Sequence, residues 1–324
     1  MPGSVPSYRS HDMTSALPAQ AAALHACGQA ATAHALPFAA LVPAIEAAAI
    51  EFHRGEITSP ERLALPLGQG GVMLSMPAVA HDLGIHKLVT VQPSNAARQL
   101  PTLHGIVTVC DAPSGRPLCQ LHGPELTGRR TAAVSMAALG RLLGHAPRQV
   151  LLIGTGVQAR HHLQAIRELH PACTVLVRGR TPVAAQAFCA QAAAPSAVQP
   201  CPGAIPESVD VVIALTTATD PIYDEPARAG RVVIGVGAFR PGMAEIGATT
   251  LQGSDLYADD PAGARHEAGD LIRAQVDWSS VHPLASLIAA GPDPSRPAVF
   301  KSVGTAAWDL AAARLAIRSL GIAV

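Results

Sequence analysis

The chain has 324 residues, of which 49% are hydrophobic and 14% charged, and its formal net charge at pH 7 is zero. A chain of this length and composition buries one or two substantial cores, which excludes an intrinsically disordered protein. Because the balanced charge provides no broad basic field for nucleic acid and no apolar run is long enough to span a bilayer, we expect a small-molecule partner, with no nucleic acid and no membrane.

The first part of the chain is rich in Ala, Ser and Pro but lacks the pattern of an export signal, because His25 and His34 interrupt it and basic residues are sparse before them. We expect residues 1–20 to form a loose tail and the protein to be cytoplasmic. The six cysteines include no C-x-x-C pair, so we expect reduced thiols. The fourteen histidines have no metal-ligand spacing, so we expect no metal site.

A β-rich region follows a predicted helix over residues 38–55, whose apolar stripe ends at a glycine. Short strands separated by Pro, Gly and Asn are predicted over residues 63–67, 71–76, 86–92, 105–110 and 117–122. Together these elements predict a small α+β domain.

Three cations stand out in this region. Arg62 precedes a strand, Lys87 lies beside apolar residues, and Arg130 lies at the junction with the next domain. If the three converge, they form a receptor for a carboxylate, with arginine giving bidentate contacts and lysine a point charge. Taken singly, each is more commonly a surface residue or part of a structural ion pair, and the sequence alone does not bring them together.

The pattern changes near residue 130. Strands predicted over residues 150–153, 174–177, 209–214 and 231–236 alternate with Ala-rich helical segments, which is typical of a parallel sheet wrapped by helices in an α/β fold. We assign residues 131–297 to this Rossmann-type domain, with residues 291–297 as a linker. A helix over residues 305–319 is predicted to pack back on the first domain, which then comprises residues 1–130 and 298–324.

The first strand of the second domain leads into a G-x-G-x-x-A turn that opens a helix, with the sequence Gly154-Thr155-Gly156-Val157-Gln158-Ala159. Gly154 permits the tight turn, Gly156 lets the backbone approach a pyrophosphate, and Ala159 lets the helix pack closely on the strand. The N-terminus of the helix then faces the phosphates. We expect the residues from Gly154 to Gln158 to bind a dinucleotide; an ordinary strand-to-helix turn is the alternative.

The next strand ends in Arg178-Gly179-Arg180-Thr181, where an NAD-selective site has Asp or Glu for the ribose hydroxyls. No carboxylate occurs between Glu168 and Glu207. We expect Arg178, Arg180 and Thr181 to lie near a 2′-phosphate, which favours NADP(H) over NAD(H). A solvated pair of loop arginines is the alternative.

Several short motifs have the order found in a known family. They are Met76-Pro77, Lys87-Leu88-Val89, Pro93-Ser94-Asn95, Leu100-Pro101-Thr102, the T-x-x-R-T-A-A block from Thr127 to Ala133, the Gly154 turn, and Val236-Gly237-Ala238-Phe239. On these motifs, over roughly residues 60–310, the chain resembles the ornithine cyclodeaminase/μ-crystallin family. The resemblance implies a homodimer whose β-rich domains pair, and an active site in the cleft between the β-rich domain and the Rossmann-type domain.

By position, the resemblance implies that Arg62 binds the substrate carboxylate, Lys87 is the active-site lysine, Thr102 is a pocket threonine and Arg130 is a second arginine that also adjoins the cofactor. The residues expected to line the nicotinamide half are Thr216, Thr217, Val236, Lys301 and Ser302. Lys87, or a water that it holds, is the expected proton donor, and His104 is a second candidate.

One motif departs from the cyclodeaminases of this family. These enzymes carry an aspartate in a V-G-G/A-D segment that handles the amine, whereas this chain reads Val236-Gly237-Ala238-Phe239 and has no carboxylate there. Cyclisation of ornithine then lacks its general base, but hydride transfer to a preformed imine does not need one. The departure, marked by Ala238, favours the reductase branch, which resembles ketimine reductases and Δ1-pyrroline-2-carboxylate reductases. The expected reaction is NADPH-dependent reduction at C2 of a cyclic imino acid, giving proline and also pipecolate.

Two alternatives stay open. An amino-acid dehydrogenase acting on pyruvate and ammonia would use the same cations and cofactor, and a carrier of the μ-crystallin type would hold NADPH without turnover. Ring size also stays open, because a pocket discriminates weakly against one methylene. Hydroxyproline degradation, proline formation and pipecolate metabolism would each be served by this chemistry.

Overall fold

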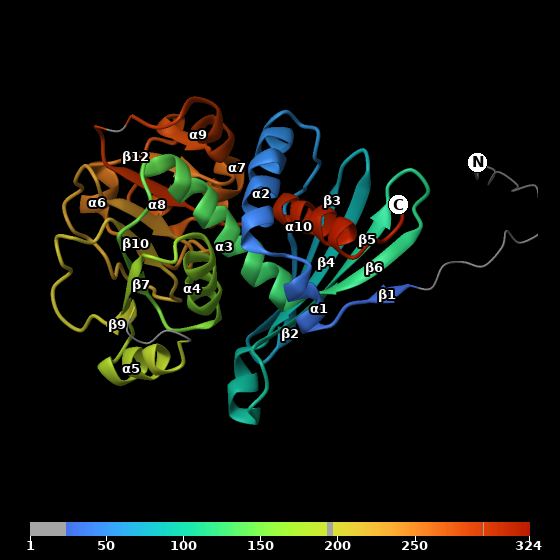
Figure 1. Ribbon diagram of the computed structural model, residues 1–324, viewed down its shortest axis with the longest axis horizontal. Helices are drawn as coiled ribbons and strands as arrows, with labels where there is room; N and C mark the ends of the chain where they lie inside the picture. Colours follow the sequence, from blue (N-terminus) through green and yellow to red (C-terminus); the bar gives the residue numbers. More distant parts are fainter. Residues whose placement is uncertain (1–23, 193–196, 294) are drawn as a thin grey trace, which may run out of the picture.

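The computed structural model describes residues 24–192, 197–293 and 295–324, so the predicted loose tail lies outside the described residues. Two sheets lie side by side, and helices fill the space between them (Figure 1). Within the described residues, no helix is both long and apolar enough to cross a membrane. All six cysteines are free thiols.

The first sheet is an antiparallel meander with one short parallel strand at its edge, in the order β1-β6-β5-β4-β3-β2. Its strands are β1 (His25–Ala26), β2 (Leu63–Gly68), β3 (Gly71–Val79), β4 (Leu83–Val91), β5 (Leu103–Asp111) and β6 (Pro117–His122). Helices α2 (Phe38–His53) and α10 (Ala306–Ser319) pack against each other, and α10 packs on β3 and β4 (Figure 1). The short helix α1 (Gln29–His34) lies beside β6. Every strand predicted in this region is confirmed; β6 has the predicted bounds, and the other four differ at one or both ends.

The second sheet is wholly parallel and has the order β13-β12-β14-β11-β10-β7-β8-β9. Its strands are β7 (Gln149–Ile153), β8 (Thr174–Arg178), β9 (Val198–Pro200), β10 (Val211–Ala214), β11 (Val232–Gly235), β12 (Asp255–Ala258), β13 (Val281–Pro283) and β14 (Ala298–Lys301). The helices of this half are α3 (Gly123–Leu142), α4 (Val157–Leu169), α5 (Pro182–Ala190), α6 (Ala248–Gln252), α7 (Pro261–Glu267), α8 (Gly269–Arg273) and α9 (Leu284–Ala290).

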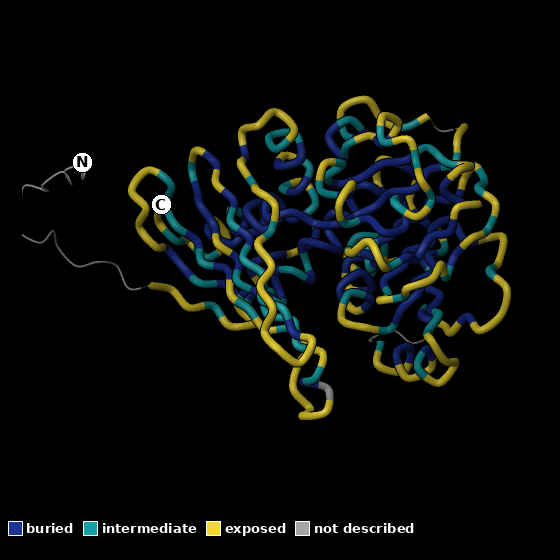
Figure 2. The backbone as a smooth tube through the Cα atoms, turned by 180° about the vertical axis from the view of Figure 1, so that it is seen from behind, coloured by how far each residue is buried: buried dark blue, intermediate teal, exposed yellow. Residues whose placement is uncertain are grey.

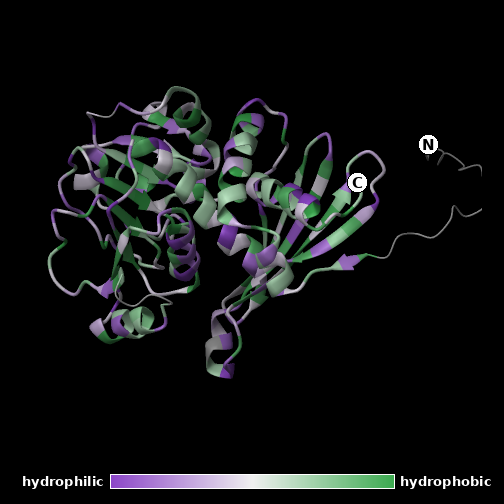
Figure 3. Cartoon of the chain, viewed as in Figure 1, coloured by the Kyte–Doolittle hydropathy of each residue, from purple (hydrophilic) through white to green (hydrophobic). Residues whose placement is uncertain are grey.

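Both faces of the second sheet are buried, which explains why its strands are apolar at consecutive positions rather than at alternate ones. Val150 and Leu152 of β7 belong to one hydrophobic core, and Leu151 and Ile153 belong to another on the opposite face. Figure 3 shows these strands as hydrophobic along their length, and Figure 2 shows burial concentrated there and where the two halves meet. The fold therefore has the predicted α/β class.

Strand β14 corrects the expected position of residues 298–301. It lies between β11 and β12, in the interior of the second sheet, and not in the first domain. All four of its residues are buried, as a central parallel strand requires. Residues 291–297 therefore connect α9 to β14 within one half of the molecule. Helix α3 also spans the expected boundary at residue 130, because it begins at Gly123 and packs on both α2 and α4.

The order of the second sheet reverses at β7. The chain runs from β7 outward through β8 to β9, and then returns to add β10 on the other side of β7. In parallel sheets, a ligand binds beyond the carboxyl ends of the strands at such a reversal. We therefore expect a ligand to bind at the loops that follow β7, β10, β11 and β14.

Candidate active site

The glycine turn after β7 forms one side of a cleft. Gly154 has φ +131°, and a Cβ added there would lie 2.7 Å from the Leu215 carbonyl oxygen, so glycine is required for the close approach. Gly156 precedes α4 as its N-cap without a side-chain cap, and a Cβ added to it would meet no atom within 4 Å. The backbone at the start of α4 is therefore open toward a ligand, which fits a pyrophosphate.

Two adjoining cavities continue from this turn. One, of about 670 Å³, is lined by the Gly154–Gly156 turn, by residues 178–181 and by the loop after β10. The other, of about 350 Å³, leads toward the first sheet. Gly156, Thr216 and Thr217 line both cavities, so one elongated ligand could occupy the two together. Val157, Gln158, Val236 and Ser302 line the inner cavity; Val236 and Ser302 are among the residues expected at the nicotinamide half, and Val157 and Gln158 among those expected at the pyrophosphate.

The two arginines after β8 differ in their surroundings. Arg178 donates hydrogen bonds from Nε to the Cys201 carbonyl (3.3 Å) and from Nη2 to the Gly203 carbonyl. Arg180 is exposed, lines the outer cavity and has no hydrogen bond or ion pair to the described residues. Thr181 is the N-cap of α5, accepting from the Ala184 N–H. None of the described residues lining this cavity is acidic, which fits an anionic phosphate better than two ribose hydroxyls.

A buried ion cluster closes the inner cavity. Lys87 projects from β4 at a core position of the strand, 2% exposed, where the alternation of the sheet calls for an apolar residue. Its Nζ lies 2.6 Å from Oδ2 of Asp309, in the first turn of α10. Oδ1 of the same carboxylate accepts a 3.0 Å hydrogen bond from Nε of Arg130 on α3. Desolvation, opposed by Asp309 and reinforced by Arg130, lowers the pKa of Lys87 to about 8.

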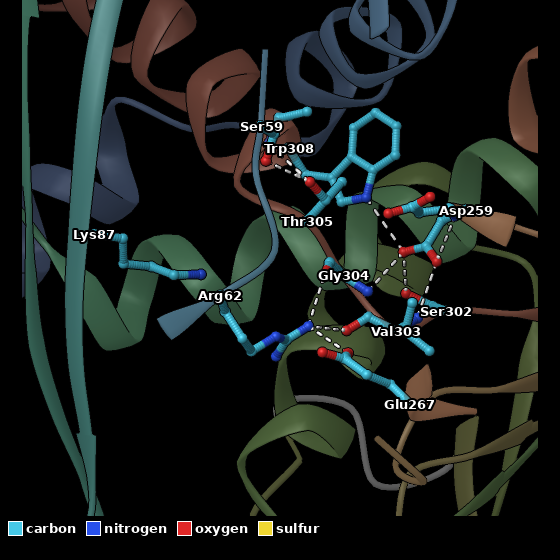
Figure 4. A network of polar contacts seen from close by, with 12 residues as sticks. Ser59, Arg62, Lys87, Asp259, Glu267, Ser302, Val303, Gly304, Thr305 and Trp308 are labelled. Carbon is cyan, nitrogen blue, oxygen red and sulfur yellow. Dashed lines mark hydrogen bonds and ion pairs between the residues drawn. The ribbon is translucent and has the colours of Figure 1, made fainter. Parts of the chain in front are cut away.

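Arg62 enters the same cavity from the segment before β2. Its Nη2 forms a 2.6 Å ion pair with Glu267 and donates to the carbonyls of Val303 (3.1 Å) and Gly304 (2.8 Å), as Figure 4 shows. Its Nε and Nη1 have no hydrogen-bond partner among the described residues. One side of the guanidinium is thus anchored, and its other nitrogens are available to a carboxylate.

The loop that holds Arg62 is itself fixed by Asp259. This carboxylate accepts hydrogen bonds from Ser302 Oγ, the Val303 and Gly304 N–H groups and Trp308 Nε1, at 2.8–3.2 Å (Figure 4). Gly304 has φ +79°, and a Cβ added there would lie 2.7 Å from Arg130 Nη1. The loop therefore adjoins Arg130, and its carbonyls hold Arg62.

A second buried carboxylate joins the loops beneath the inner cavity. Glu245 accepts from the N–H groups of Thr216, Gly237 and Ala238 and from Thr216 Oγ1. It therefore ties the loop after β10 to the loop after β11. Burial raises the pKa of Glu245 above its ordinary value.

Three predicted site residues lie outside the cavities. Thr102 and His104 are exposed, and Leu103 between them lines the inner cavity, because successive side chains of a strand point to opposite faces. Lys301 is buried and pairs with Asp270 at 2.6 Å, below the loops rather than on their surface. Arg62, Lys87 and Arg130, by contrast, line one cavity.

Sequence reasoning missed several groups of this site. Asp309 and Glu267 pair with cations that are distant in the chain, Glu245 joins two loops, and no local pattern marks these three acids. Thr127 lines the inner cavity one turn before Arg130, and its buried Oγ1 has no hydrogen-bond partner among the described residues. The T-x-x-R spacing was a usable signal for Thr127, since residues three apart share a helix face.

A parallel sheet with a glycine turn at its order reversal, next to a buried group of cations, defines a two-domain protein that binds a dinucleotide and an anionic small molecule. The chain belongs to the ornithine cyclodeaminase/mu-crystallin family, whose model matches residues 27–320. The resemblance on which the sequence analysis relied is therefore confirmed.

The chain is similar to characterised reductases. It is 53% identical over 287 residues to the Δ1-pyrroline-2-carboxylate/Δ1-piperideine-2-carboxylate reductase of Azospirillum brasilense, covering 88% of this chain and 92% of that protein. It is 52% identical to Δ1-pyrroline-2-carboxylate reductase 2 of Burkholderia ambifaria, covering 89% and 93%. Among solved structures, the Δ1-pyrroline-2-carboxylate reductase of Thermococcus litoralis, in complex with NADH and L-proline, superimposes with a TM-score of 0.83 at 25% identity, covering 93% and 99%.

Proposed function

We propose that this protein reduces cyclic imino acids with NADPH, converting Δ1-pyrroline-2-carboxylate to proline and Δ1-piperideine-2-carboxylate to pipecolate. The observation that carries the proposal is the cavity in which Arg62, Lys87 and Arg130 meet, next to the dinucleotide cleft. The similarity to reductases that act on these two substrates supports it.

In the proposed reaction, the three cations bind the substrate carboxylate and so orient C2 of the ring. When bound, the reduced nicotinamide supplies the hydride that C2 accepts. Leu74, Met76, Val91, Leu103 and Phe239 provide an apolar lining for the ring methylenes. The imine nitrogen needs a proton, and the Lys87 ammonium is the candidate donor, directly or through a water.

The lining of the inner cavity favours this reaction over cyclisation of ornithine. None of the described residues lining it is acidic. Phe239 lines the wall there, and Ala238 is buried with its N–H on Glu245. A diamino acid would therefore find no carboxylate to accept a proton from its amine, whereas a preformed imine requires none.

For the cofactor, we propose a preference for NADP(H) over NAD(H), with Arg180 as the main contact for the 2′-phosphate. Arg180 has no hydrogen bond or ion pair to the described residues, and none of the described residues in the outer cavity is acidic; both observations support this preference. Arg178, held by two carbonyls, would shape the loop.

We also propose a homodimer formed through the first sheet. The open side of this sheet exposes large apolar side chains, among them Leu63, Leu65, Leu67 and Ile106, and all residues of β2 are exposed. Contiguous exposed apolar residues on an edge strand mark an interaction surface. Light scattering coupled to gel filtration tests this: Leu65→Glu should shift the protein toward monomers, and a wild-type monomer would refute the dimer.

The function is tested by measuring oxidation of NADPH by the purified protein, with Δ1-pyrroline-2-carboxylate, Δ1-piperideine-2-carboxylate and pyruvate plus ammonia in parallel, and with NADH in place of NADPH. We expect turnover of the cyclic imines and a higher kcat/KM with NADPH. Turnover of pyruvate plus ammonia, without turnover of either cyclic imine, would instead indicate an amino-acid dehydrogenase. Tight binding of NADPH without turnover of any substrate would indicate a carrier.

A further inference from the structure

Asp309 is a fully buried carboxylate that contacts two cations of the cavity without lining the cavity itself. Oδ2 lies 2.6 Å from Lys87 Nζ, and Oδ1 accepts from Arg130 Nε at 3.0 Å. Each oxygen thus holds one cation. Because Lys87 comes from β4, Arg130 from α3 and Asp309 from α10, the cluster joins three elements that converge behind the proposed substrate.

The charges around Lys87 show what Asp309 contributes. Among the described residues, the charged groups with the largest effects on the ammonium are Asp309 from α10, Arg130 from α3 and Arg62 from the segment before β2. Of these three groups, Asp309 alone is negative. Desolvation and both arginines favour the neutral amine, so the ammonium depends on this one carboxylate for its charge.

We propose that Asp309 is a positioning residue that keeps Lys87 in its charged form and holds Lys87 and Arg130 in register to receive one substrate carboxylate. This rests on the proposed reductase function. Two cations and one buried carboxylate leave one net positive charge, which matches one carboxylate group of the substrate. A buried cation pair without Asp309 would carry like charges with no compensation, which proteins avoid.

The fold of α10 does not depend on Asp309 alone. The helix begins at Thr305, whose side chain accepts from the Ala307 N–H, and neighbouring Trp308 donates to Asp259. Arg314, further along the helix, pairs with Asp82 and Glu51. These contacts set the position of α10, so Asp309→Asn, which keeps the shape and removes the charge, is expected to fold.

The test is the pH dependence of kcat/KM for reduction of Δ1-pyrroline-2-carboxylate by Asp309→Asn. If protonated Lys87 is required, activity falls as the pH rises through the pKa of Lys87. Loss of the negative charge lowers that pKa, so the fall in kcat/KM on the basic side of the profile (the basic limb) should move down by about one pH unit or more, and kcat/KM near pH 8 should fall at least about fivefold. Asp82→Asn is the matched control, because it removes a carboxylate from another ion pair of α10 and should leave the limb in place.

A basic limb at the wild-type pH in Asp309→Asn would overturn the proposal, whatever the loss of kcat, since a merely structural residue lowers activity without moving the limb. If Asp309→Asn does not fold, Asp309→Glu decides. It retains the charge but displaces it by one methylene, so it should keep the wild-type limb and raise KM. A wild-type KM in this variant would contradict the positioning role.

Failure of the reductase function is distinguished by a binding measurement. Pyrrole-2-carboxylate, a flat carboxylate of the same ring size that accepts no hydride, is titrated into the wild type and Asp309→Asn across the same pH range. Suppose that the wild type binds this ligand but shows no imine turnover. If binding is then lost at a lower pH in Asp309→Asn than in the wild type as the pH rises, the result supports the role of Asp309 and refutes the reductase function. No binding to the wild type would refute both.

Discussion

The guanidinium of Arg62 and the carboxylate of Glu267 form a 2.6 Å ion pair that links the segment before β2 to α7 in the other half of the molecule. The pair uses only Nη2, and Nε and Nη1 have no hydrogen-bond partner among the described residues. Glu267 therefore orients an arginine that substrate can still engage with two nitrogens.

Removal of the Glu267 charge should weaken substrate binding more than turnover. We expect Glu267→Gln to raise KM for the imine roughly threefold to tenfold, and Arg62→Ala to raise it further, with smaller changes in kcat. Steady-state kinetics of the two variants beside the wild type give the comparison. An unchanged KM in Arg62→Ala would show that Arg62 does not anchor the carboxylate.

The same pair predicts a pH dependence. Burial, opposed by Arg62 and reinforced by Asp259, raises the pKa of Glu267 to about 7. Above this pH the carboxylate is charged and holds Arg62, and below it the proton abolishes the ion pair. The ratio of KM for Glu267→Gln to KM for the wild type should therefore fall toward one as the pH drops below 7. A ratio that is constant from pH 6 to pH 8 would argue against this role.

The cofactor preference should depend on Arg180 more than on Arg178. Arg180→Asp places a negative charge in the outer cavity, so we expect it to lower the kcat/KM ratio of NADPH to NADH by roughly tenfold or more. Arg178→Ala should affect both cofactors alike, because its guanidinium bonds to two loop carbonyls. If Arg180→Asp leaves the ratio unchanged, Arg180 does not read the 2′-phosphate.

Lys87 should be essential for turnover. Lys87→Met has a similar volume but neither charge nor proton, so we expect kcat/KM to fall by at least roughly a hundredfold. NADPH affinity, followed by the fluorescence of the bound cofactor, serves as the control for folding and should change little. Wild-type turnover in this variant would refute both the carboxylate-binding and the proton-donor roles.

Thr127 should contribute through its hydroxyl. Its buried Oγ1 lacks a partner among the described residues, and buried polar atoms are rarely left unpaired once a ligand is bound. We expect Thr127→Val, which keeps the shape of the side chain, to reduce kcat/KM by roughly threefold to thirtyfold without lowering thermal stability. A variant with wild-type kinetics would mean that this hydroxyl meets neither substrate nor cofactor.

The sequence was sufficient to predict the features that depend on which residues are neighbours along the chain. The glycine turn after β7 and the meander from β2 to β6 could be found because their spacing along the chain reflects their geometry directly. Thr102 and His104 do not line the inner cavity, because alternate residues of a strand face opposite sides and the motif did not reveal that Leu103 faces inward. Strand β14 was assigned to the wrong half because a short apolar run carries no information about its neighbours.

The carboxylates behind the cations could not have been predicted in this way. Asp309, Glu267 and Glu245 look like ordinary surface acids in the sequence, and their role arises only when distant elements pack together. The cations were recognisable by family resemblance, whereas the groups that orient them were visible only in three dimensions.

The return of the chain to the first sheet through α10 has a consequence for biosynthesis. A ribosome makes Lys87 and Arg130 long before it makes Asp309, so the nascent first domain holds two core cations without their counterion. Burial of unpaired charges is unfavourable, so the two cations gain their buried counterion only after α10 has left the ribosomal tunnel. The ion cluster of the first domain is therefore completed only after the whole second domain has been synthesised, although two of its three members are made before that domain.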